Sequence, residues 1–220
     1  EGNTSESLKI LNSQFTFDST AASSGAVYVH NWNTVMIENT IFKNCWTSDD
    51  TLAGAMTYGI GSGEKNNCVV KFDSCNFTDR NADSETGARV IYTNFGRYSE
   101  WSNCLIEDST NSNYNGKGPL LYLGHDDITS TSFDSLTFQN NKASIGGGAG
   151  IIITGVKSRI SFRDLTFINN ELAGESGGAI SLEYNEPNSA PKTVSFTKCS
   201  FSDNKANGKP GGSISINSPT

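Results

Sequence analysis

Residues 194–204 read VSFTKCSFSDN, and the stretch GGSISI follows them at 211–216. An earlier part of the chain has nearly the same pattern, ISFRDLTFINN at 160–170 and then GGAISL at 177–182. In both copies apolar and polar residues alternate, and this two-residue period is typical of β-strands. Clusters of Asn, Asp, Gly and Ser separate the alternating stretches and predict sharp turns between short strands.

This pattern occurs seven times along the chain. Each copy is marked by an apolar anchor, and the anchors are Ile10, Ile37, Phe72, Trp101, Phe133, Phe162 and Phe196, with a mean spacing of 31 residues. A repeat of this length made of short strands predicts one rung of a parallel β-helix, in which each inward side chain stacks on its equivalent one rung away. We therefore predict an all-β chain of about seven rungs, each with roughly 30 residues and three short strands. We expect residues 1–220 to form a single β-helix segment of a longer repeat protein.

A second apolar residue stands five positions after each anchor. We predict that these residues fill the centre of the rod, stacked about 4.8 Å apart. The predicted core ladder is Phe15, Phe42, Phe77, Phe138, Phe167 and Phe201, with Ile106 in the fourth copy. Three residues further on, the last three copies carry Asn141, Asn170 and Asn204, whose amides we expect to hydrogen-bond along the rod. The earlier copies carry Asp18, Cys45, Arg80 and Ser109 at that position.

The five cysteines do not form a metal-binding or redox motif. Neither Cys-x-x-Cys nor a Cys/His cluster occurs, so we expect no metal and no cofactor. Cys75 and Cys104 take the same place in consecutive rungs, and their side chains should stack inside the rod. Directly stacked residues on parallel strands lie further apart than a relaxed disulfide requires, which favours free thiols over a strained bridge. Cys199 should lack a partner within the chain.

Composition excludes some classes of function. The net charge is −7, with 16 Lys and Arg against 23 Asp and Glu. Nucleic-acid binding requires a basic surface, which this balance does not supply. The longest mostly apolar stretch, 149–156, is much shorter than the roughly 20 residues of a membrane span. Two sequons, at Asn3 and Asn76, predict N-glycosylation of a secreted protein.

The alternation of Gly-Gly-Ala-Ile, intact at 177–180, with Phe-x-x-Asn, as at Phe167 and Asn170, resembles the defining repeat of the polymorphic outer membrane proteins of chlamydiae and of related protist surface proteins. The resemblance covers residues 130–220 best. It implies a right-handed parallel β-helix displayed outside the cell, secreted or on the cell surface, where several members of the family are adhesins. The expected partner is a protein or glycan on a cell surface, or neighbouring copies in an assembly.

Parallel β-helices also occur in polysaccharide enzymes, whose catalytic sites require paired acids and bases on adjacent rungs. The best local constellation is His125, Asp126 and Asp127, a weak candidate for catalysis or metal binding. No acids and bases were found at matching outward positions of adjacent rungs, and no catalytic residue is predicted. Exposed aromatic residues suggest instead a binding patch; its candidate members are Tyr28, Trp32, Trp46 and Tyr58.

The sequence thus predicts an extracellular, non-enzymatic rod that acts as a surface adhesin or as a structural unit of an extracellular assembly. We expect the long loops to make the contacts, among them 59–67, 94–100 and 184–192. The alternatives are a polysaccharide-acting enzyme and a carbohydrate-binding module built on a parallel β-helix.

Overall fold

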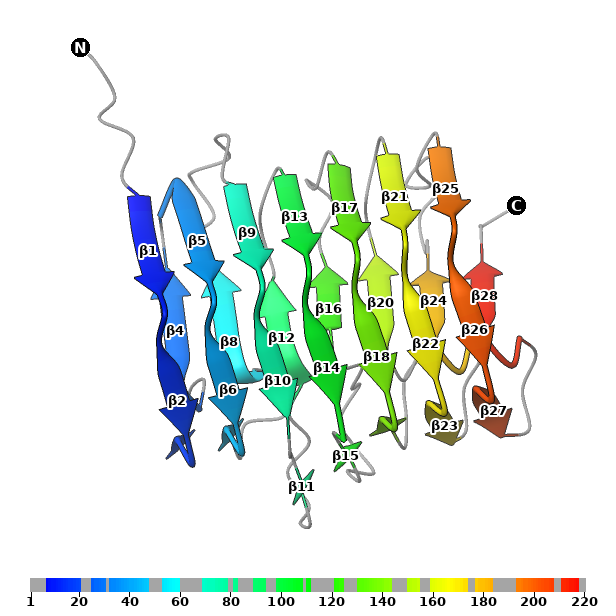
Figure 1. Ribbon diagram of the computed structural model, residues 1–220, viewed down its shortest axis with the longest axis horizontal. Coiled ribbons are helices and arrows are strands. Elements are labelled where there is room, and N and C mark those ends of the chain that lie inside the picture. The colour runs from blue at the N-terminus through cyan, green and yellow to red at the C-terminus, as the bar shows by residue number, and fades with distance from the viewer. Residues whose placement is uncertain are drawn as a thin grey trace.

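In a computed structural model of the chain, the described residues form a rod of β-strands and their connections (Figure 1). The structure describes residues 7–20, 25–30, 32–47, 53–59, 69–78, 81–82, 89–93, 98–108, 110–111, 121–124, 130–143, 150–154, 159–173, 177–183, 193–207 and 211–217. All the strand pairs are parallel and join consecutive copies of the repeat, so the chain advances along the rod by one strand spacing per repeat.

Three sheets have seven strands each, one from each copy of the repeat. The first sheet contains β1 (Ser7–Leu11), β5 (Thr34–Glu38), β9 (Val69–Asp73), β13 (Tyr98–Ser102), β17 (Ser130–Asp134), β21 (Arg159–Arg163) and β25 (Thr193–Thr197). The second contains β2 (Gln14–Thr16), β6 (Ile41–Lys43), β10 (Asn76–Thr78), β14 (Leu105–Glu107), β18 (Thr137–Gln139), β22 (Thr166–Ile168) and β26 (Ser200–Ser202). The third contains β4 (Val27–His30), β8 (Ala53–Gly59), β12 (Arg89–Thr93), β16 (Leu121–Gly124), β20 (Ile151–Thr154), β24 (Ile180–Glu183) and β28 (Ile214–Asn217).

Each rung has a fourth short strand, which the sequence analysis did not predict. Five of these corner strands form one sheet, β11 (Asn81–Ala82), β15 (Thr110–Asn111), β19 (Lys142–Ala143), β23 (Glu171–Ala173) and β27 (Lys205–Asn207), and two more pair separately, β3 (Ser19–Thr20) and β7 (Trp46–Thr47). The prediction of three strands per rung was therefore wrong by one. These strands are too short for their alternation to stand out among the polar residues around them.

The predicted core columns are confirmed. The seven anchors from Ile10 to Phe196 are direct register partners in the first sheet. Phe138, Phe167 and Phe201 are register partners in the second, with ring centroids 4.8 Å and 5.1 Å apart. Both columns are almost fully buried in the inner rungs, and Trp101 is part of this core. Such continuous burial of aromatic area is the main stabilising contribution to the rod.

Residues with positive φ, in the left-handed backbone conformation, make the corners on either side of the second sheet. Seven residues between the first and second sheets have φ near +50° (Asn12, Asn39, Ser74, Asn103, Ser135, Asp164 and Lys198), and six more follow the second sheet (Phe17, Asn44, Asp108, Asn140, Asn169 and Asp203). Asn and Asp adopt this conformation more readily than other non-glycine residues. The Asn and Asp residues of the repeat therefore have a defined conformational role, whereas Phe17 and Lys198 adopt it at a cost.

The Gly-Gly pair has two different functions at its two positions. Gly177 and Gly211 have φ of +81° and +75°, so the first glycine provides the left-handed turn. Gly178 lies in ordinary backbone, but an added Cβ would collide with the carbonyl oxygen of Gly212 in the next rung. The glycine immediately before Ala179 is therefore required by close packing between rungs, and the left-handed turn belongs to the glycine before it.

Candidate interaction face

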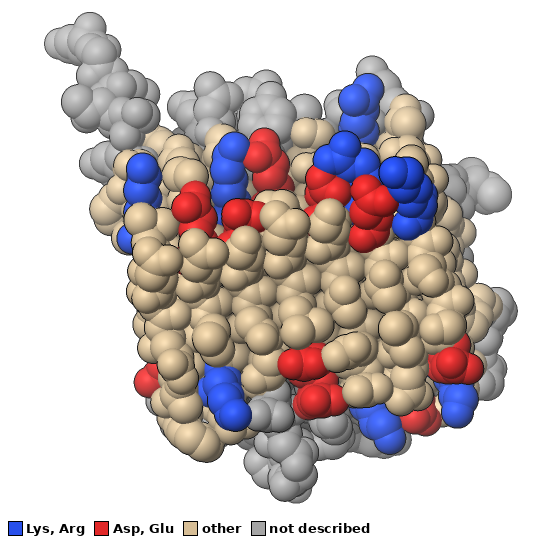
Figure 2. Space-filling model, viewed as in Figure 1, with Lys and Arg blue, Asp and Glu red and all other residues tan. Residues whose placement is uncertain are grey.

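The outward side of the first and second sheets forms one continuous surface, which we call the broad face. Figure 2 shows charged side chains in two bands across it, separated by a band that carries no charge. The uncharged band includes the first outward column of the second sheet, formed by Gln14, Ile41, Asn76, Leu105, Thr137, Thr166 and Ser200. The side chains of this column are exposed or half-buried.

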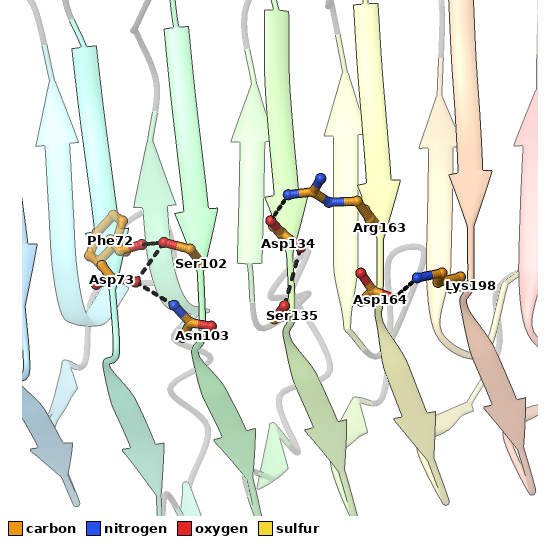
Figure 3. A network of polar contacts seen from close by, with 9 residues as sticks. All are labelled: Phe72, Asp73, Ser102, Asn103, Asp134, Ser135, Arg163, Asp164 and Lys198. Atoms are coloured by element: carbon orange, nitrogen blue, oxygen red, sulfur yellow. Dashed lines mark hydrogen bonds and ion pairs between the residues drawn. The ribbon is translucent and has the colours of Figure 1, made fainter.

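One charged band follows the border between the two sheets (Figure 3). Asp134 and Arg163 are register partners in neighbouring rungs and form an ion pair through Nη2 of the arginine. Lys198 and Asp164 approach within 4.0 Å in the next pair of rungs. The hydroxyl group of Ser135 also donates to Asp134, at 3.1 Å. At these two places an acidic side chain therefore lies beside a basic side chain of the neighbouring rung.

Asp73 is held by neutral donors from the adjacent rung. Its Oδ1 accepts hydrogen bonds from the hydroxyl of Ser102 at 2.7 Å and from Nδ2 of Asn103 at 2.8 Å. These two bonds lower the pKa of Asp73 below its ordinary value. The hydrogen bond from Arg163 lowers the pKa of Asp134 in the same direction. Both carboxyl groups are therefore fixed as carboxylates at neutral pH.

This network corrects one result of the sequence analysis. Charged residues do recur at matching outward positions of adjacent rungs, because Glu38 pairs in register with Asp73, and Asp134 with Arg163. The signal was present in the sequence: all four residues directly follow the anchor of their repeat. It was missed because the same position holds Leu11, Ser102 and Thr197 in the other copies.

Further polar pairs join the rungs elsewhere on the surface. Nζ of Lys71 lies 2.6 Å from Glu100, and Nζ of Lys142 lies 3.6 Å from Glu171. Nε2 of Gln139 donates to Glu107 at 2.6 Å, from one rung to the one before it. Exposed pairs of this kind contribute little to stability individually. Their shared feature is that each charged group is satisfied by a neighbour along the rod.

Of the two predicted glycosylation sites, Asn76 lies in the uncharged band. It belongs to β10 and pairs in register with Ile41 and Leu105 in the adjacent rungs. Its Oδ1 is buried and has no hydrogen-bond partner. The residue is half-buried on the outward side of the sheet, so a glycan attached there would extend away from the core. Asn3 lies outside the described residues, and glycosylation at both sites stays a prediction.

The structure describes two side chains of the predicted aromatic patch. Tyr28 is 55% exposed on the third sheet. Trp32 is half-buried and packs against the core. Trp46 and Tyr58 lie in β7 and β8, and Tyr58 pairs in register with Val29, which is buried. The described part of the patch therefore offers one well-exposed aromatic ring, that of Tyr28.

The other predicted site residues lie largely outside the described part of the chain. This holds for His125, Asp126 and Asp127, which follow β16, and for the loop 184–192. Of the loop 59–67 only Gly59 is described, at the end of β8. The loop predicted at 94–100 is wrong in its second half, because residues 98–100 belong to β13. Among the described residues there is no group of three His, Cys, Asp or Glu that could hold a metal ion.

The cysteine geometry agrees with the prediction. Cys75 and Cys104 occupy equivalent positions in adjacent rungs, and both are buried free thiols. Hydrogen bonding to Cys75, together with burial, raises the pKa of Cys104, which keeps its thiol protonated. Cys199 is also free and is only half-buried, because it belongs to the last rung. We assign no redox or metal chemistry to these thiols.

Stacked parallel strands with inward columns define this protein as a β-solenoid. The chain matches a family model described as a right-handed beta helix region over residues 2–217, and it belongs to that family. This match also gives the handedness of the rod. Neither the comparison with curated proteins nor the comparison with solved structures finds a match. The described residues contain no helix with the length and hydropathy that a membrane span requires.

Proposed function

We propose that this β-helix is an extracellular, non-enzymatic rod that acts as an adhesin or as a structural unit of an extracellular assembly. The observation that carries the proposal is the distribution of charge on the broad face. Ion pairs and hydrogen bonds between rungs occupy many of its charged side chains, and an uncharged band runs beside them (Figure 2). A partner can bind such a band without removing water from unpaired charges.

The chemistry of the band suggests an extended partner. Thr137 and Thr166 offer hydroxyl groups at successive rungs, while Ile41 and Leu105 offer aliphatic contacts. These groups repeat along the rod at the strand spacing of about 4.8 Å. A glycan or an extended peptide segment that lies along the rod would meet one uncharged side chain of this column at each rung. We therefore propose a cell-surface protein or glycan as the partner.

The lowered pKa values of Asp73 and Asp134 make these two carboxyl groups an unsuitable pair for acid–base hydrolysis. Acid–base hydrolysis by a carboxyl pair needs one group with a raised pKa as the acid and one ionised group as the base or nucleophile. Asp73 and Asp134 both have lowered pKa values, since each accepts hydrogen bonds from the next rung. Neither is suited to donate a proton near neutral pH.

An extracellular location is supported by two sequence features. The Gly-Gly-Ala-Ile and Phe-x-x-Asn motifs resemble those of the polymorphic outer membrane proteins, which are displayed outside the cell. The sequon at Asn76 also lies on the outward side of its strand. These features favour secretion or surface display over a location inside the cell.

Binding to a glycan array and to a panel of extracellular proteins tests the proposal. We expect Thr166→Lys to weaken binding at least tenfold, because it places a charge in the uncharged band. Tyr28→Lys, on the third sheet, is the matched control and should leave binding unchanged. If Tyr28→Lys abolishes binding and Thr166→Lys does not, the third sheet binds the partner and the carbohydrate-binding module becomes the better description.

The enzyme alternative has a separate test. Incubation with acidic and neutral polysaccharides, with and without calcium, should yield no new reducing ends or unsaturated products. Turnover that is lost in Asp73→Asn or Asp126→Asn would contradict the non-enzymatic proposal and identify the carboxyl group responsible.

A further inference from the structure

The sequon at Asn76 lies inside the uncharged band, in the middle of a sheet and not in a loop. We propose that an N-linked glycan on Asn76, attached before the rod closes, covers part of this band and so regulates the binding proposed for it. The inference rests on the proposed function, because it names the regulation of the same surface. It goes beyond the prediction of glycosylation, since it assigns the glycan a time of attachment and an effect on binding.

Backbone hydrogen bonds hold the sequon on both sides. Residues 76–78 form β10, which lies between β6 and β14 in the second sheet. The main-chain N–H of Asn76 donates to the carbonyl of Thr40 at 3.0 Å, and that of Leu105 donates to the carbonyl of Cys75 at 2.9 Å. Glycosylated sequons usually stand in surface loops. A transferase therefore cannot draw this strand into its active site unless these bonds break.

The middle residue of the sequon belongs to the core. Phe77 is 1% exposed, and its ring centroid lies 5.0 Å from that of Phe42 in the preceding rung. Drawing Asn76 out of the sheet would also draw this ring into water, which is strongly unfavourable. Transfer of a glycan to Asn76 must therefore precede the pairing of β10 with its two neighbours.

The side-chain amide of Asn76 points its nitrogen away from the core. Oδ1 is buried, whereas Nδ2 is not, and no described residue accepts a hydrogen bond from Nδ2. In the transfer, Nδ2 attacks C1 of the first sugar of a lipid-linked oligosaccharide diphosphate. An N–C bond forms, the bond from C1 to the diphosphate oxygen breaks, and Nδ2 loses one proton. The lipid diphosphate leaves, and the finished rung can hold the sugar on its outward side.

The neighbours of Asn76 offer apolar area to a glycan. Ile41 is 40% exposed and Leu105 is half-buried, and both are register partners of Asn76. Each lies one strand spacing away, about 4.8 Å, so the first sugars reach both side chains. Contact with the apolar faces of the sugar rings removes aliphatic area from water. The glycan thus covers the aliphatic part of the band, which a partner would otherwise contact.

Transfer and folding compete for the same strand. β14 follows β10 in the chain, so one edge of β10 stays unpaired until β14 has been synthesised. Chains that receive the glycan in this interval fold with a covered band, and chains that do not receive it fold with an open one. Two forms with different binding therefore arise from one sequence.

Hydroxyl-radical labelling read by mass spectrometry tests the covering of the band. The protein is secreted from eukaryotic cells, and its glycosylated form is compared with Thr78→Ala, which lacks the sequon but keeps Asn76. We expect labelling of Ile41 and Leu105 to fall at least threefold in the glycosylated form. Ile168, 37% exposed on β22, is the internal control and should not change. Absence of a glycan at Asn76, or equal labelling of Ile41 in both proteins, would overturn the inference.

The time of attachment has its own test. Unglycosylated protein from bacteria is incubated with an oligosaccharyltransferase and a lipid-linked oligosaccharide. Folded protein should remain unmodified, whereas protein diluted from urea directly into the mixture should be glycosylated at Asn76. Equal modification of the folded protein would show that the closed rung admits the transferase, and would contradict the required order.

Binding to the glycan array and to the panel of extracellular proteins tests the regulation. We expect the glycosylated wild type to bind at least tenfold more weakly than Thr78→Ala. The matched control is Ser130→Asn in the Thr78→Ala background, which creates a sequon at 130–132, at the start of β17 on the first sheet. A glycan there lies outside the uncharged band and should leave binding unchanged.

The two proposals fail in different ways. If Thr78→Ala binds nothing on the array or the panel, the proposed function is wrong, and the labelling of Ile41 still shows whether the glycan covers the band. If Thr78→Ala binds and the glycosylated wild type binds equally well, the function of the broad face stands and the inference is wrong. Circular dichroism establishes that every variant is folded.

Discussion

Nδ2 of Asn141 donates a hydrogen bond of 2.9 Å to Oδ1 of Asn170, one rung further along the rod. The main-chain N–H of Asn141 donates to the same oxygen at 3.3 Å, and Nδ2 of Asn170 donates to the carbonyl of Phe138 at 3.0 Å. Both asparagines are fully buried. The ladder needs side chains that donate through a nitrogen and accept through an oxygen, as the asparagine amide does. A carboxylate has no donor, and an aliphatic group has neither a donor nor an acceptor.

Asn170→Ala should lower the free energy of unfolding by about 2–4 kcal/mol, because it removes the buried acceptor of two hydrogen bonds from Asn141 and the buried donor to the carbonyl of Phe138. Urea unfolding followed by circular dichroism measures the change. Asn207→Ala is the control: its exposed Nδ2 donates to Glu171, and its loss should cost less than about 0.5 kcal/mol. Equal effects of the two substitutions would contradict a structural role for the ladder.

Phe167→Ala should cost about 3–5 kcal/mol, since its ring is fully buried between the rings of Phe138 and Phe201. The same unfolding measurement applies. The neighbouring Ile168 points outward, and Ile168→Ala should cost less than about 1 kcal/mol. A loss below about 1 kcal/mol for Phe167→Ala would show that the column does not support the rod.

Phe17→Asn should stabilise the protein by roughly 0.5–1 kcal/mol, because Phe17 has φ of +59° and is 70% exposed. Asparagine adopts this conformation at less cost and occupies the equivalent position at Asn44, Asn140 and Asn169. Thermal unfolding should show a higher Tm. The reverse substitution, Asn140→Phe, should lower it, and a lower Tm for Phe17→Asn would contradict the conformational argument.

The stability of the fold should depend on pH partly through Asp73. Its folded-state pKa is lowered by the hydrogen bonds from Ser102 and Asn103, so its contribution is complete above the unfolded value near pH 4 and disappears as the pH falls through the folded value. Asp73→Asn should therefore be less stable than the wild type near neutral pH, by less than about 1 kcal/mol at this partly exposed site. Unfolding curves from pH 2 to 7 measure the difference.

The difference between the wild type and Asp73→Asn should shrink as the solution is made more acidic. Ser102→Ala removes the shorter hydrogen bond and should reduce the same pH dependence without changing the carboxyl group. A difference that grows below pH 4 would show that the carboxyl group is not stabilised in its ionised form.

The columns of the rod were predictable from the sequence because similar inward side chains recur at a nearly fixed spacing. Each rung must fill the same cross-section, so Phe138, Phe167 and Phe201 appear with the same neighbours. The cysteine positions followed from the same alignment. Cys45 is a further example, since its thiol donates to the carbonyl of Phe15 as Asn170 does to that of Phe138.

The outward network was not predictable in the same way. Packing does not restrict the side chain at an outward position, so residues of different charge occur there. The residue after the anchor is acidic at Asp73 and Asp134 but basic at Arg163. Such pairs are recognised only when neighbouring rungs are compared residue by residue. The short corner strands escaped prediction for a related reason, because two or three residues are too few to show a period.

The equivalence of successive rungs also affects how such a protein can evolve. Leu136 and Leu165 occupy the same place in consecutive rungs, and each is followed by a Thr-Phe pair that begins a strand of the second sheet. Recombination between the corresponding stretches of DNA would delete or duplicate one whole rung and leave every column in register. One recombination event can therefore shorten or lengthen the rod by one rung, and the product can still fold.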